Sequence, residues 1–244
     1  MLREIISILP ESLGDLSLGV AIGGALVGLA FWLAGARFSR SLITLIAVAI
    51  GTSVGMRLPR WLGWSIDGMA IGVGGAVILG VSGYLLHRTW TGLCLGLLLA
   101  LWGVFGSLIA LMRTQPMLAI SVDWRTGVPA ACQSMWNQLP ISLAHAFAMA
   151  VGVGLVVGAA MTIFWPRLSR VTTWSLAGIT LIVLMFASAQ QTTHSNWIGS
   201  LKVSDALQAT GLLALVLLGA LIQWGILPPA RPSTGRKRSL PMDE

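Results

Sequence analysis

The chain has 244 residues, of which 56% are hydrophobic and only 9% are charged, and its mean hydropathy is +0.85. Soluble domains carry about 25% charged residues because water must solvate their surface, so this composition excludes soluble enzymes, nucleic-acid-binding modules and disulfide scaffolds. The net charge of +7 does not indicate nucleic-acid binding, because the basic residues lie at the ends of apolar segments and not on one polar face. The composition therefore predicts an all-α, polytopic membrane protein that contacts the lipid bilayer.

Seven apolar segments are long enough, or nearly so, to cross a membrane. A hydrocarbon core of about 30 Å needs roughly 20 helical residues. The expected spans are residues 17–35, 41–56, 67–86, 91–112, 140–164, 171–189 and 206–227. The second span is the shortest, and we expect the nearby Arg57 and Arg60 to extend their charged groups to the membrane surface.

The positions of Lys and Arg predict the orientation of these spans. Nine basic residues fall on one side and six on the other, and the positive-inside rule places the richer side in the cytoplasm. The N-terminus is then outside and the C-terminus is cytoplasmic, in what we expect to be a bacterial inner membrane. The resulting segments are an outer interfacial lead-in (1–16), a seven-helix transmembrane domain (17–227) with an outer loop (113–139), and a basic cytoplasmic tail (228–244).

The first six spans show an internal repeat. Offsets of 51 and 130 residues align equivalent positions in three segments: Gly24, Gly75 and Gly154 in the first helices, and Arg37, Arg88 and Arg167 in the turns. Each repeat is a hairpin with a Gly-rich helix, a tight basic turn and a returning helix, and a lone seventh helix follows the third hairpin. Glycine pairs at four-residue spacing predict close GxxxG packing inside one bundle, with a homodimer face as the alternative.

The first hairpin resembles a known family. Residues Leu33–Leu42 read LAGARFSRSL and join the glycine helix to a returning helix whose glycines extend to Gly55. This pattern resembles the seven-helix domain of the transmembrane protein 198 family over residues 17–227. The resemblance implies seven membrane helices and an outside N-terminus. The vertebrate member is regarded as a membrane scaffold in Wnt signalling that helps a receptor to become phosphorylated.

Charged and titratable side chains are scarce inside the predicted spans. No Asp, Glu, Lys or Arg lies near the middle of a span, so ion pumping through a buried carboxylate has no candidate carrier. His145 is the candidate intramembrane polar site, either as a proton relay or as a side chain bonded to a helix neighbour or to water. Asp67 and Asp205 are expected to cap helices. The spacing predicts no metal or cofactor site and no nucleophile–base set, so we expect a non-enzymatic protein.

The arginines of the three turns predict a basic cytoplasmic platform. Its members are Arg37, Arg40, Arg88, Arg167 and Arg170. Such a platform suits acidic protein partners or anionic lipid headgroups, and the same arginines could serve only to set topology. The leading hypothesis is a scaffold or accessory subunit that acts through packing with a membrane-protein partner or with copies of itself.

The alternative hypothesis is a channel or facilitator for a small neutral or weakly polar solute. Bundles built from repeats often carry such pathways where the repeats meet. Residues that could line a pathway include Thr52, Ser53, Ser82, Ser107, Thr162 and Gln208. Small polar residues also serve as hydrogen-bonding contacts between packed helices, so their arrangement in space distinguishes the two functions.

Overall fold

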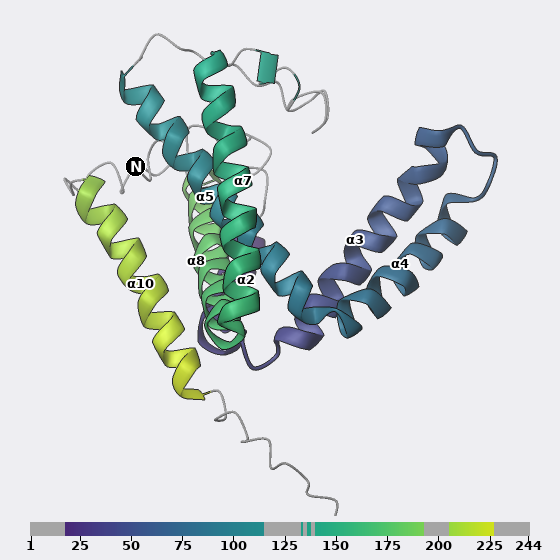
Figure 1. Cartoon of the computed structure of the whole chain (residues 1–244), viewed down its shortest axis with the longest axis horizontal. Coiled ribbons are helices and arrows are strands. Elements are labelled where there is room, and N and C mark those ends of the chain that lie inside the picture. The colour runs from purple at the N-terminus through teal and green to yellow at the C-terminus, as the bar shows by residue number, and fades with distance from the viewer. Residues whose placement is uncertain (1–17, 115–132, 134–135, 138–139, 193–204, 227–244) are drawn as a thin grey trace, which may run out of the picture.

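The computed structural model describes residues 18–114, 133, 136–137, 140–192 and 205–226, and within these ranges the secondary structure is helical, without strands (Figure 1). The helices are α2 (Leu18–Ala34), α3 (Ser39–Leu62), α4 (Gly68–Leu85), α5 (His87–Thr114), α7 (Ile141–Phe164), α8 (Pro166–Thr192) and α10 (Asp205–Ile226). Their bounds follow the apolar segments of the sequence. The all-α fold is therefore confirmed.

Six of these helices are long and apolar enough to cross a membrane, and α2 is a shorter apolar helix of 17 residues. Large apolar side chains such as Ile78, Val156 and Leu221 are exposed on the outside of the bundle. Hydrocarbon solvates such side chains as well as a protein core does. The chain is thus a multi-pass membrane protein, and the crossing of the membrane by all seven helices stays a prediction.

Helix α3 differs from the short second span of the sequence analysis. It begins at Ser39 and continues to Leu62, so that Arg57 and Arg60 lie within the helix and are exposed. It ends at Gly63, whose φ of 66° is in the left-handed region that glycine adopts without strain. The next helix begins as expected, because the Asp67 carboxylate accepts a hydrogen bond of 3.0 Å from the Met69 N–H.

The closest helix pairs are not the pairs joined by the basic turns. Helix α3 packs on α4, α5 packs on α7, and α2 packs on α8, with α10 against α8 and α2. Figure 1 shows α3 and α4 leaning away together from the other helices. Each strongly packed pair therefore combines helices from two different hairpins of the sequence analysis.

Glycines bring these paired helices together through their backbones. A Cβ on Gly51 of α3 would collide with the Gly75 backbone of α4. A Cβ on Gly158 of α7 would lie 2.5 Å from the Gly92 carbonyl oxygen of α5, and Gly178 of α8 is equally close to α2. Side chains would hold these helices apart, so the missing Cβ atoms allow the contacts that replace a hydrophobic driving force in lipid.

Helix α8 is the central helix. Half of its spanning window is buried, compared with 11% of the window of α10. Its Val171 and Trp174 pack with Ala36 and Ile43 from the start of the chain in one buried cluster. Phe31 meets the Trp174 ring edge-on, with ring centroids 5.3 Å apart. This cluster lies close to the α2–α3 and α7–α8 turns and gives them a rigid support.

Candidate functional site

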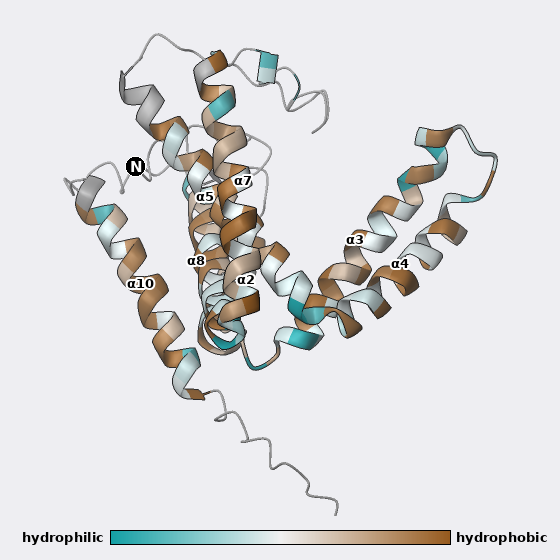
Figure 2. Cartoon of the chain, in the orientation of Figure 1, coloured by the Kyte–Doolittle hydropathy of each residue, from teal (hydrophilic) through white to brown (hydrophobic). Residues whose placement is uncertain are grey.

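The five arginines of the predicted platform occupy three helix junctions. Arg37 lies in the α2–α3 turn and Arg40 in the first turn of α3, while Arg88 begins α5 and Arg167 and Arg170 begin α8. The bond from Arg40 to the Tyr84 carbonyl joins the first junction to the second, and the buried cluster of Ala36, Ile43, Val171 and Trp174 joins the first to the third. All five arginines therefore lie at one end of the bundle, which we call the arginine end. Figure 2 shows hydrophilic residues where α3 and α5 begin, in contrast to the apolar helix centres.

Local sequence makes these junctions short. Between α2 and α3, Arg37 N–H donates to the Ala34 carbonyl and closes a tight turn. Gly35 is needed in this turn, because a Cβ there would lie 2.8 Å from the Cβ of Trp174. Between α7 and α8 only Trp165 intervenes, and Pro166 follows at the first helical position, where its missing N–H costs nothing.

Two of the arginines hold the ends of other helices. The Arg40 guanidinium lies 3.6 Å from the centroid of the Tyr84 ring, and its Nε donates to the Tyr84 carbonyl at 3.3 Å. Arg167 repeats this arrangement with Trp224, at 4.4 Å from the ring and 2.9 Å from the carbonyl oxygen. Both carbonyls lie at helix C-termini, where free lone pairs and the helix dipole favour a positive charge.

Positive charge is concentrated around the start of α5. The charges of Arg170, Arg40 and Arg88 all act on His87. Within the described ranges the acidic residues are Asp67 and Asp205, at the N-termini of α4 and α10, which are the opposite ends of those helices. The described part of the arginine end therefore carries positive charge without acidic counter-charge, and its field attracts anions.

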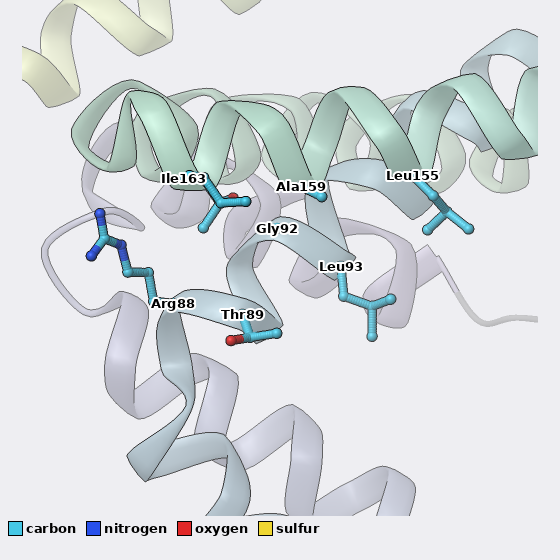
Figure 3. A pocket seen from close by; sticks show the side chains of 8 residues that line it. Arg88, Thr89, Gly92, Leu93, Leu155, Ala159 and Ile163 are labelled. Atoms are coloured by element: carbon cyan, nitrogen blue, oxygen red, sulfur yellow. The ribbon is translucent and has the colours of Figure 1, made fainter.

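A pocket opens beside Arg88. It has a volume of about 590 Å³ and lies between the first turns of α5 and the last turns of α7. Figure 3 shows Arg88 at one end of the lining and Leu155 at the other, with Thr89 and Leu93 on the α5 side and Ile163 on the α7 side. The pocket thus joins a cationic end to an apolar wall.

A glutamine that the sequence analysis did not select fastens α10 to α2. The Gln223 side chain is only 2% exposed. Its Nε2 donates to the carbonyls of Phe31 and Trp32 at 3.1 and 2.6 Å, and its Oε1 accepts from the Ala36 N–H at 3.0 Å. Gln223 could have been identified in the sequence as a single glutamine in an otherwise apolar helix turn, because a buried amide requires hydrogen-bond partners.

A second connection between α10 and α2 uses the backbone of α10. The Trp32 indole N–H donates to the Leu215 carbonyl at 2.9 Å, and the Ser175 hydroxyl of α8 donates to the Val216 carbonyl at 2.7 Å. Gly219 makes room for both donors, because a Cβ there would collide with the Trp32 indole and lie 2.5 Å from the Ser175 oxygen.

The structure places His145 apart from the arginine end. It lies near the start of α7, five residues after Pro140, and its side chain is exposed on the outside of the bundle. Among the described residues, no group of three or more His, Cys, Asp or Glu side chains is arranged to hold a metal ion. Its function as an intramembrane polar site stays a prediction.

No protein-family model, curated protein or solved structure matches this chain.

Proposed function

We propose that the chain is a non-enzymatic scaffold or accessory subunit of a bacterial inner membrane, with the arginine end in the cytoplasm as its binding face. The convergence of five arginines from three junctions carries this proposal. Arg40 and Arg167 stabilise helix ends, whereas the side chains of Arg37 and Arg88 are exposed and make no hydrogen bond or ion pair with the described residues. Exposed cations without counter-charges suit an acidic partner or anionic headgroups.

The packing of the helices supports a structural function. Gly24, Gly75 and Gly154 occupy the same position in the three repeats and lie against α8, α3 and α5, respectively. The first helix of each repeat therefore packs on the second helix of another, and α2 with α8 closes the cycle. We propose that three hairpin repeats interlock in this way, which holds the three arginine-bearing turns in a fixed arrangement.

The small polar side chains favour this function over solute transport. Thr52, Ser82, Ser107 and Thr162 each donate to a backbone carbonyl three or four residues earlier in their own helix. They lie on four different helices, α3, α4, α5 and α7. Hydroxyls that are bonded within separate helices contribute to packing and leave little polar surface for a shared pathway.

Native mass spectrometry of the protein extracted with its surrounding lipid tests the proposal. We expect a stoichiometric protein partner or a homo-oligomer, and we expect the complex to be lost when Arg37→Gln and Arg170→Gln are combined. The matched control combines Arg57→Gln and Arg60→Gln, which removes two charges from the far end of α3.

Membrane orientation must be measured on the same variants, by accessibility of single introduced cysteines. The proposal requires the orientation to persist while binding falls in the arginine-end variant. Of the nine basic residues on the cytoplasmic side, seven remain in this variant, and they still outnumber the six on the other side. Equal binding by both double variants would contradict the proposal, as would a monomer that carries only a small solute.

A further inference from the structure

The pocket between α5 and α7 combines two kinds of surface in an order that matches a membrane lipid. Arg88 and Thr89 line it at the start of α5, and Leu93 lies about 7.5 Å further along the helix at 1.5 Å per residue. From α7, Leu155 and Ile163 complete the apolar part. Leu93 and Ile163 are 43% and 67% exposed, so the pocket opens to the surface of the bundle as a groove.

The depth of this groove in the membrane is defined by the spans that form it. The α5 span begins at His87 and the α7 span ends at Phe164, so Arg88 and Ile163 lie at the same membrane boundary. The groove continues from that boundary toward the hydrocarbon core through Leu93 and Leu155. Headgroups reside at the boundary and acyl chains below it, which is the order of charged and apolar residues in the groove.

The charge at the boundary selects the type of lipid. The Arg88 side chain makes no hydrogen bond or ion pair with the described residues, and the charges of Arg170 and Arg40 lie nearby around His87. A guanidinium and a hydroxyl together can donate several charge-assisted hydrogen bonds to phosphate oxygens. A volume of about 590 Å³ is in the range of pockets that hold one ligand, roughly 300–1,000 Å³.

We propose that the α5–α7 groove binds one anionic glycerophospholipid, with its phosphate at Arg88 and Thr89 and one acyl chain along Leu93 and Leu155. This inference rests on the proposed function, because it names the anionic partner of one part of the arginine end. The bound lipid would fill the space beside the Gly92 contact and link α5 to α7 at the membrane surface.

Lipid titration by native mass spectrometry tests the groove, with phosphatidylglycerol and phosphatidylcholine as probes for the full-length protein in detergent. We expect tighter binding of phosphatidylglycerol. The Arg88→Gln variant should bind it at least about tenfold more weakly, which corresponds to about 1.4 kcal/mol, because a charge-assisted hydrogen bond to the phosphate is lost. The Arg57→Gln variant removes an exposed arginine from α3 outside the groove and should bind as the unmodified protein does.

A second pair of variants tests the apolar part without a change in charge. Ala159 lines the groove and is exposed, so Ala159→Phe fills the groove without entering the protein core. Ala148→Phe introduces the same ring at an exposed alanine of α7 outside the groove. We expect Ala159→Phe to abolish the preference for phosphatidylglycerol and Ala148→Phe to preserve it.

Three results would overturn the lipid proposal: equal binding of both lipids, phosphatidylglycerol binding that Ala159→Phe leaves unchanged, or a protein segment found in the groove in place of lipid. Failure here is distinguishable from failure of the scaffold function. Loss of the protein complex in the Arg37 and Arg170 double variant, combined with no lipid preference, would refute only the groove. Groove binding with no complex would refute only the scaffold.

Discussion

Replacement of Gln223 by methionine should destabilise the protein by separating α10 from the end of α2. Trp32 and Ala36 are four residues apart, so their carbonyl and N–H would bond to each other if α2 continued as a helix. Instead the Gln223 amide lies between them, accepting from one and donating to the other. Methionine has a similar length and fills the site, but it satisfies neither group.

The size of the effect follows from the hydrogen bonds that are lost. The Phe31 carbonyl retains the bond from Gly35 N–H at 2.9 Å, so two buried groups are left without partners. At about 1–3 kcal/mol for each such group, the loss is about 2–6 kcal/mol. The average of about 0.6 kcal/mol per hydrogen bond measured between membrane helices, applied to three bonds, gives about 2 kcal/mol as the lower limit.

Unfolding in mixed micelles with increasing SDS measures this loss as a change in the free energy of unfolding. The Gln223→Glu variant provides a check on mechanism. A protonated carboxyl can accept from Ala36 N–H and donate to the Trp32 carbonyl, whereas the ionised form repels that carbonyl. The variant should therefore retain more stability at a pH where this carboxyl is protonated than at a pH where it is ionised. A Gln223→Met variant within about 0.5 kcal/mol of the unmodified protein, the range of ordinary surface substitutions, would refute the reasoning.

Three further substitutions, two of them with a matched control, test the close helix contacts and the cap. Gly51→Ala should destabilise the α3–α4 pair by about 1–3 kcal/mol, because the new Cβ meets the backbone of α4. The control Gly106→Ala places its Cβ where no atom lies within 4 Å, so it should be neutral or stabilising. Unfolding in SDS compares the stabilities of the two variants. Gly219→Ala should weaken the α10 contact by a similar amount, while Gly211→Ala on the same helix has open space and should gain up to about 1 kcal/mol; disulfide trapping between α2 and α10 reads the difference. Asp67→Ala should cost about 1 kcal/mol through loss of the α4 cap, seen as faster amide exchange in its first turn.

Local features of the sequence predicted the helices closely. The expected spans 67–86 and 140–164 correspond to α4 at Gly68–Leu85 and α7 at Ile141–Phe164. Length and hydrophobicity suffice here, because a helix in lipid must satisfy its own backbone and needs no partner to form. The second span was the exception, since the charges of Arg57 and Arg60 interrupted the apolar pattern although the helix continued through them.

The sequence predicted which arginines lie together at the candidate site, but it did not predict what they contact. Arginines in short turns were visible in the chain, yet the partners of Arg40 and Arg167 lie 44 and 57 residues away at Tyr84 and Trp224. Neither pattern nor spacing marks an aromatic residue as a cation's partner across such a distance. The positions of the neighbouring helix ends in the tertiary structure determine which arginines bond to another helix and which remain exposed.

The amino-acid sequence alone determined which segments form apolar helices and which turns carry the arginines, because hydrophobicity, capping and charge act within a few residues. The tertiary structure decided which helices meet. Lipid tails are as apolar as the surfaces of these helices, so hydrophobicity gives no preference for one partner over another. The choice comes from the fit of small residues and buried polar groups, as where Gly178 admits the backbone of α2 and Gln223 bonds to its last turn.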